Sequence, residues 1–192
     1  MSFGGGAWLN PPAEWSLEAG RLRAVTDART DFWRETHYGF VRDSGHLFAR
    51  EVAGPFTAQL RVQARYEALY DQAGIMVRLD EENWVKAGIE WSDGEPNLGS
   101  VLTRGRSDWA TGPFNGDPAD FWLRATVAGG AIRVQASRDG LRWPLLRLAP
   151  FPEAPAYRVG PMCCTPERAG LAVQFSEFEV GPPLGKGLHD LS

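Results

Sequence analysis

Hydrophobic and polar residues alternate with a period of two along most of the chain, and Gly and Pro interrupt this alternation at short intervals. Side chains of a strand point alternately to the two faces of a sheet, so each alternating segment predicts a half-buried strand. The strands do not alternate with long helical segments, which predicts two packed antiparallel sheets. The predicted strands are 21–26, 46–50, 56–66, 73–79, 84–91, 98–103, 121–127, 132–137, 143–148, 157–163 and 169–180.

Short polar or Gly-containing connections predict which strands are neighbours. "AGGAI" at 128–132 and "SRDGLRW" at 137–143 have the Gly residues that tight turns with positive φ require. "LDEENW" at 79–84 is a polar turn between two alternating segments. The stretch "LYDQAGIMVRLDEENWVKAGIEW" at 69–91 is therefore expected to be an antiparallel hairpin.

The two strands of this hairpin carry their polar residues on the same side. Val85, Ala87 and Ile89 alternate with polar positions and are expected to face the core, as are Ala73 and Ile75. The opposite surface is predicted to present Gln72, Gly74, Met76, Arg78, Trp84, Lys86, Gly88 and Glu90.

Lys86 and Glu90 lie on that surface but four residues apart, which places them ~13 Å from each other along a strand. They cannot pair with each other along the strand, so each needs another partner. Gly74 and Gly88 leave bare backbone there, which weakens a strand unless something approaches closely. A groove filled by a ligand is one explanation.

Two further segments, 30–40 and 103–112, are expected to be loops in which an Asp lies beside aromatic residues. Aromatic rings cover the C–H faces of sugars while nearby polar groups bond the hydroxyls. Trp residues also fill β-sheet cores, and this structural role applies to most of the eight. Trp33 and Trp109 are the two for which a binding role is favoured.

Composition and charge exclude several classes of partner. The 192 residues have a net charge of −4, and their Lys and Arg are scattered singly, which argues against nucleic acid and anionic membranes. The chain has no apolar run long enough to span a membrane and no secretory signal pattern, so a cytoplasmic location is expected. One domain is expected over 1–180, with a flexible Gly- and Pro-rich tail at 181–192.

No established cofactor or metal motif is visible. His37, His46 and His189 are dispersed, and the adjacent Cys163 and Cys164 lack the spaced ligands of a zinc site. Both cysteines are expected to be reduced core residues. Phosphate-binding, dinucleotide-binding and serine-nucleophile motifs are also missing, so neither a cofactor nor a metal is expected.

Five segments together resemble one protein family. They are "TDFWRETHYGF", "YDQAGIMVRLDEENWVKAGIEW", "SVLTRGRSDWA", "SRDGLRW" and "VGPMCCTPERAGLAVQFSEFEV". In this order they are similar to the uncharacterised proteins related to the regulation-of-enolase protein, within the concanavalin A-like lectin and glucanase superfamily. The resemblance implies a jelly roll of two antiparallel sheets, one of them concave. It also implies a ligand-binding groove cluster of Trp33, Tyr70, Asp71, Gln72, Lys86, Glu90, Ser107, Asp108 and Trp109.

Three functions are compatible with these residues. The favoured hypothesis is a non-catalytic carbohydrate-binding or carbohydrate-related module that takes a sugar or another small polar ligand in the groove. The first alternative is a glycosidase-like enzyme using Glu90 with Asp108, or Glu90 with Asp31. Glucanases of the superfamily commonly carry alternate acidic residues along one strand, whereas this strand offers only Glu90, so no catalytic pattern is recognisable. The second alternative is a protein-interaction or regulatory domain with no sugar ligand.

Overall fold

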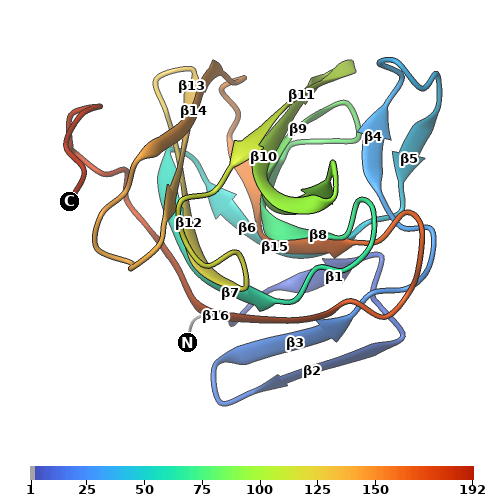
Figure 1. Ribbon diagram of the computed structural model, residues 1–192. Helices are drawn as coiled ribbons and strands as arrows, with labels where there is room; N and C mark the ends of the chain where they lie inside the picture. Colours follow the sequence, from blue (N-terminus) through green and yellow to red (C-terminus); the bar gives the residue numbers. More distant parts are fainter. Residues whose placement is uncertain (1–2) are drawn as a thin grey trace.

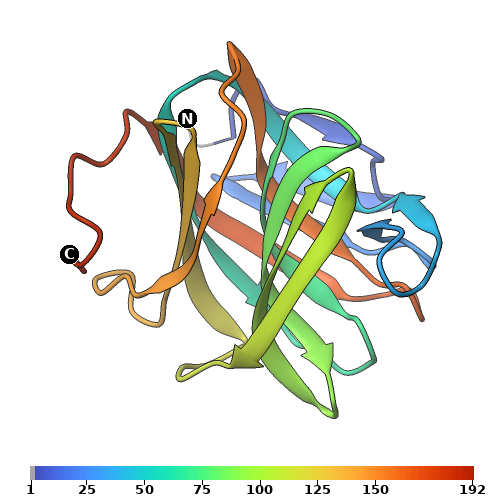
Figure 2. The ribbon, with the colours of Figure 1, turned by 90° about the horizontal axis from the view of Figure 1, so that it is seen from above.

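The computed structural model describes residues 3–192, and within that range every regular element is a β-strand. Two antiparallel sheets of seven strands pack face to face as a sandwich, with a small two-stranded hairpin outside it (Figures 1 and 2). The predicted all-β sandwich of two antiparallel sheets is therefore confirmed.

The first sheet, sheet A, is the curved sheet that bears the candidate site. Its strands in spatial order are β1 (Ala7–Leu9), β6 (His46–Ala53), β15 (Ala156–Cys164), β8 (Gln72–Arg78), β9 (Asn83–Ser92), β10 (Glu95–Arg104) and β11 (Arg106–Pro113). The order of sheet B is β14 (Leu145–Pro150), β13 (Ala131–Ser137), β12 (Asp120–Ala128), β7 (Phe56–Ala64), β16 (Ala172–Gly181), β3 (Arg21–Val25) and β2 (Glu14–Glu18). The separate hairpin consists of β4 (Phe32–Arg34) and β5 (Val41–Asp43).

All eleven predicted strands are present, but the two segments expected to be loops, 30–40 and 103–112, contain strands. The hairpin strand β4 lies in the first segment and β11 in the second. β11 is an edge strand that leaves most of its residues exposed, so its inward positions Ser107 and Trp109 do not produce an apolar alternation in the sequence. β1 and β2 at other sheet edges were missed too.

The main core fills the space between the sheets. Ala73, Ile75, Val85, Ala87 and Ile89 all belong to it, which confirms the predicted inward face of the β8–β9 hairpin. Cys163 is part of this core, and both cysteines are free and buried, as expected.

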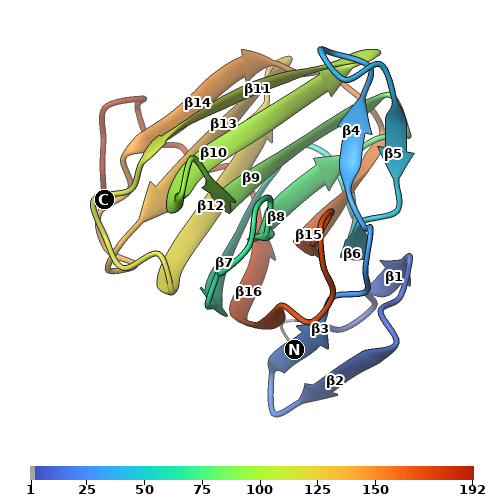
Figure 3. The same cartoon turned by 45° about the vertical axis from the view of Figure 1, so that its right-hand side comes forward.

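The opposite face of sheet A is only partly open to solvent. Hairpin β4–β5 stands against it (Figure 3) and forms a second apolar cluster there. Phe32 and Trp33 of the hairpin pack with Met76 and Trp84 of the sheet, and Trp84 is 1% exposed. Residues predicted to lie on an outer surface are thus buried beside the site.

Gly74 and Gly88 face each other across β8 and β9. A Cβ at Gly74 would lie 1.8 Å from the carbonyl oxygen of Ala87, and one at Gly88 would lie 2.1 Å from that of Ala73. The neighbouring strand makes the close approach, so a ligand is not needed to explain these glycines.

The segment after β16 runs along the outer face of sheet B. The amide of Leu184 donates to the Thr57 hydroxyl over 3.0 Å, and the amide of Trp143 donates to the Leu191 carbonyl over 2.8 Å. The division of the chain at residue 180 stays a prediction.

Candidate functional site

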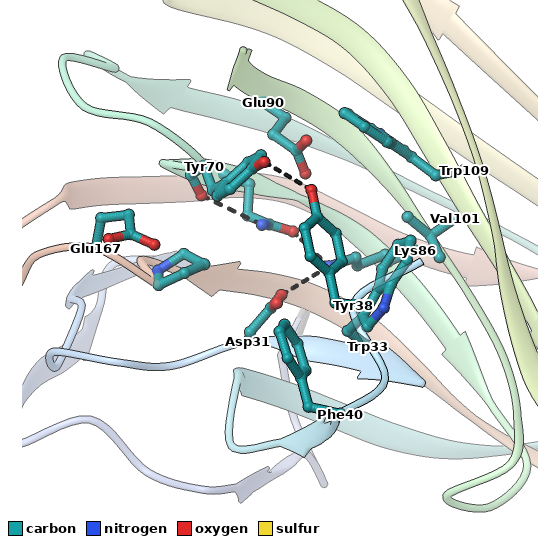
Figure 4. Close-up of a pocket in the computed structure, with 12 residues that line it drawn as sticks. Asp31, Trp33, Tyr38, Phe40, Tyr70, Lys86, Glu90, Val101, Trp109 and Glu167 are labelled. Carbon is teal, nitrogen blue, oxygen red and sulfur yellow. Dashed lines mark hydrogen bonds and ion pairs between the residues drawn. The ribbon is translucent and has the colours of Figure 1, made fainter. Parts of the chain in front are cut away.

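A pocket of about 210 Å³ opens on the outer face of sheet A, between β8–β10 and hairpin β4–β5 (Figure 4). This volume is below the ~300–1,000 Å³ of pockets for drug-sized ligands, so one small molecule fills it. Its lining consists of Asp31, Trp33, Tyr38, Phe40, Tyr70, Gln72, Lys86, Glu90, Val101, Trp109, Pro166 and Glu167.

Lys86 forms the floor of the pocket and is 3% exposed. Its Nζ donates to Asp31 Oδ1 over 3.1 Å and to Gln72 Oε1 over 2.7 Å. Burial alone would lower the pKa of the Lys86 ammonium, but the carboxylates of Asp31 and Glu90 outweigh this and raise it. Lys86 is therefore a fixed cation that is already paired.

Glu90 points into the pocket from β9, four residues beyond Lys86 on the same face of the strand (Figure 4). Within residues 3–192 no side chain or amide donates a hydrogen bond to its carboxyl group or forms an ion pair with it. Burial raises the pKa of Glu90 to about 7, since Lys86 offsets only part of the desolvation and Asp31 adds repulsion. A carboxyl group without a partner, titrating near neutral pH, is typical of functional sites.

Aromatic residues form the walls. The Trp33 indole N–H donates to the Thr36 carbonyl over 3.0 Å, and Tyr38 stacks on Phe40 with ring centroids 5.4 Å apart. Trp109 is half-buried and faces the pocket from β11. The indole of Trp33 is held in place, while the ring of Trp109 is free to contact a ligand.

The hydroxyls of Tyr38 and Tyr70 lie 2.8 Å apart and link the hairpin to the segment before β8. This hydrogen bond and burial raise the pKa of Tyr70 to about 12, so its hydroxyl stays protonated. Tyr70 has φ 62°, a conformation that is strained for a bulky residue. Its amide, which donates to the Trp91 carbonyl over 2.8 Å, holds it there. Backbone strain of this kind is concentrated at functional sites.

Six of the nine predicted groove residues line the pocket, and three do not. The six are Trp33, Tyr70, Gln72, Lys86, Glu90 and Trp109. The exceptions, Asp71, Ser107 and Asp108, have other partners.

Asp71 is fully buried away from the pocket. Its carboxylate pairs with the Arg168 guanidinium and accepts hydrogen bonds from the amides of Glu67 and Ala68 at 3.0 and 3.1 Å. Asp71 therefore fixes the loop before β8 and is not placed to contact a ligand in the pocket.

Ser107 and Asp108 alternate on β11, so they point in opposite directions. The Ser107 hydroxyl bonds the Arg34 amide at 2.9 Å and the Thr103 hydroxyl at 2.8 Å, which attaches the hairpin to the sheet. Asp108 pairs with Arg147, at 2.6 Å, on the side away from Trp109. Glu90 and Asp108 therefore do not share the pocket.

The sequence does not predict five of the lining residues, Tyr38, Phe40, Val101, Pro166 and Glu167. Asp31 is predicted only as a possible catalytic partner of Glu90. Segment 30–40 is predicted to be a loop near the site. Alternation of hydrophobic and polar residues cannot predict which side chains of a hairpin lie over a neighbouring sheet.

Among residues 3–192, His, Cys, Asp and Glu side chains form no group of three or more that would hold a metal ion. The same residues contain no helix of the length and apolarity needed to cross a membrane.

The sandwich of two seven-stranded sheets, with a pocket on the curved outer face of one, defines a concanavalin A-like β-sandwich protein. The chain belongs to the family described as "Protein of unknown function (DUF1349)", which it matches over residues 8–183. It is 60% identical to Regulation of enolase protein 1 of Saccharomyces cerevisiae over 187 residues, covering 97% of this chain and 94% of that protein. The predicted family is thereby confirmed.

Solved structures give the same fold. A functionally unknown protein from Saccharomyces cerevisiae is similar with a TM-score of 0.95 and 57% identity, over 96% of this chain and all of that one. A GH43 protein of Bacillus licheniformis has a TM-score of 0.72 at 17% identity, over 93% of this chain and 38% of that one. The carbohydrate binding module CBM66 of Bacillus subtilis has a TM-score of 0.56 at 12% identity, over 90% and 94%.

Proposed function

We propose that this protein binds one small carbohydrate or carbohydrate-like molecule in the pocket between β8–β10 and hairpin β4–β5, without catalysing its conversion. The observation that carries the proposal is the Glu90 carboxyl group, which faces an aromatic-walled pocket and has no hydrogen-bond partner among residues 3–192. Glu90 is only partly exposed, and a ligand that donates to its carboxyl group would supply the partner that the lining residues do not.

The chemistry of the walls supports a sugar ring. Trp109 presents a half-buried ring to cover C–H groups, while Glu90 and Asp31 accept hydrogen bonds from hydroxyls. The likeness to a carbohydrate binding module agrees with this, although it bears on the fold alone.

Catalysis by Glu90 and Asp108 is not supported, because Asp108 faces Arg147 outside the pocket. Glu90 and Asp31 do share the pocket, but Asp31 is engaged by Lys86 and by the Phe32 amide. A glycosidase needs two carboxyl groups that are free to act as acid and nucleophile. Because Asp31 is not free, a binding role fits these residues better than a catalytic one.

Calorimetric titration with mono- and oligosaccharides tests the proposal. We expect saturable binding of at least one monosaccharide. Trp109→Ala should weaken that binding by at least about tenfold, equivalent to ~1.4 kcal/mol, because the ring loses its stacking surface. Trp15→Ala is the matched control, since Trp15 is 48% exposed and lies outside the pocket.

An equal loss in both variants, or binding that survives Trp109→Ala, would place the sugar elsewhere. Absence of binding across the whole panel would favour a protein-interaction domain, which the name of the yeast relative also suggests. The expected cytoplasmic location stays a prediction.

A further inference from the structure

The polar atoms that face the pocket are mostly hydrogen-bond acceptors. Three carboxyl groups, Asp31, Glu90 and Glu167, line it together with one ammonium group, that of Lys86. The Gln72 amide is already used, because its Nε2 donates to the Tyr70 carbonyl over 3.2 Å and its Oε1 accepts from Lys86. A ligand must therefore donate hydrogen bonds more than it accepts them.

The charges of the pocket also favour a cation. Lys86 is neutralised by Asp31, with 3.1 Å between Nζ and Oδ1, so Glu90 and Glu167 have no counter-ion in the lining. None of the described lining residues is Arg. An anionic ligand would add repulsion to an acidic pocket, whereas a cation would supply the missing partner of Glu90.

Five aromatic rings surround the same space. Trp33, Tyr38, Phe40, Tyr70 and Trp109 converge on it from the hairpin, the loop before β8 and β11 (Figure 4). Aromatic faces attract cations through the ring quadrupole, most strongly where water is displaced. An aromatic enclosure that contains the Glu90 carboxyl group without a counter-ion is an arrangement suited to an amine.

We infer that the ligand of this pocket carries a protonated primary amine on a ring of the size of one sugar unit, and that the amine donates to Glu90. The inference rests on the proposed function, because it names the class of ligand for the same pocket. The ring lies against Trp109, and Tyr38 and Tyr70 close the side opposite the sheet. An amino sugar has both required features, namely hydroxyls on a ring and an ammonium group.

Three probes separate the charge from the hydroxyls. D-glucosamine has both, D-glucose has the hydroxyls without the charge, and cyclohexylamine has the charge without the hydroxyls. Each is titrated calorimetrically near neutral pH into the wild-type protein and into Glu90→Gln. The matched control is Glu95→Gln, which changes an exposed carboxyl group at the start of β10, outside the pocket lining.

We expect D-glucosamine to bind at least about tenfold more tightly than D-glucose, and Glu90→Gln to reduce its affinity by about 10- to 100-fold. Glu95→Gln should leave it unchanged. Thermal melting of each variant confirms that it is folded.

The possible failures are distinct. Equal binding of D-glucose and D-glucosamine, unaffected by Glu90→Gln, would overturn the amine and leave the sugar proposal standing. Binding of cyclohexylamine alone, lost in Glu90→Gln, would support the cation site and overturn the sugar proposal. If none of the three probes binds, both are overturned.

Discussion

Glu90 reduces the stability of the folded protein and also supplies the pocket with a carboxyl group that a ligand can bind. Its side chain is pointed into the pocket by the alternation of β9, and the groups facing it are Asp31, Lys86, Tyr38, Tyr70 and Glu167. Only Lys86 is positively charged, and Asp31 already pairs with it. The ionised form of Glu90 is therefore less stable in the folded chain than in water.

Stability should depend on pH through this group. The folded pKa of about 7 lies above the ordinary value of 4.5, so the unfavourable contribution is absent below pH 4.5 and grows as pH rises to 7. Above pH 7 it reaches about 3 kcal/mol. Glu90→Gln removes it, so this variant should melt at the same temperature as wild type near pH 4.5 and at a higher temperature at pH 8.

Thermal melting across this range, with Glu95→Gln as control, checks the prediction. A lower melting temperature for Glu90→Gln at every pH would contradict the prediction, because it would mean that the carboxylate stabilises the folded protein.

At the residue scale, the sequence predicts the direction of a side chain correctly where alternation determines it. Alternation places Gln72, Lys86 and Glu90 on one surface, and all three line the pocket. The family resemblance put Asp71 in the groove cluster, whereas the structure buries it in an ion pair with Arg168, 97 positions away, which leaves no local pattern in the sequence. Asp108 was misplaced for a different reason, namely that an Asp beside a Trp on one strand must face the opposite way.

At the scale of elements, β8 and β9 are held so close that their facing glycines admit no side chain. Gly74→Ala should reduce the free energy of unfolding by about 3 kcal/mol or more, because the new methyl group would overlap the Ala87 carbonyl. Gly112→Ala on β11 is the control, since nothing lies within 4 Å of a Cβ there, and it should change stability by less than ~0.5 kcal/mol. Urea denaturation measures both.

Equal effects of the two substitutions would show that loss of glycine itself, and not the spacing of β8 and β9, determines the cost. Because Lys86 and Gln72 project from these same strands, a shift in spacing would also disturb the floor of the pocket.

The elements that the sequence predicted are those with one apolar face against the main core. β4, β5 and β11 were missed because they are short or lie at an edge and place no alternating apolar face against the main core. Tyr38 and Phe40 lie in the connection between β4 and β5, where no alternation predicts which way a side chain points.

At the scale of the whole molecule, the hairpin that completes the pocket lies apart from the main core. The main core between the two sheets includes no residue of hairpin β4–β5. The hairpin is attached instead through the second apolar cluster and through polar contacts, among them the Arg78–Asp43 ion pair and the Tyr38–Tyr70 hydroxyl pair. Within the hairpin, the Glu35 amide donates a hydrogen bond to the Phe40 carbonyl over 2.7 Å.

This separation has a consequence for local opening. Segments that contribute few residues to the main core can unfold locally and exchange their amide hydrogens while the rest of the protein stays folded. In deuterated water, the amides of Glu35 and Gly39 should therefore exchange through a lower-energy opening than the central amides of β9. Equal protection at both places, measured by mass spectrometry or NMR, would contradict this.

A ligand seated between the hairpin and the sheet would slow the exchange of the hairpin amides and leave those of β9 unchanged. The two-sheet sandwich can thus stay folded while the hairpin opens and closes over the pocket. Circular dichroism would report such a molecule as fully folded even when its binding site is open.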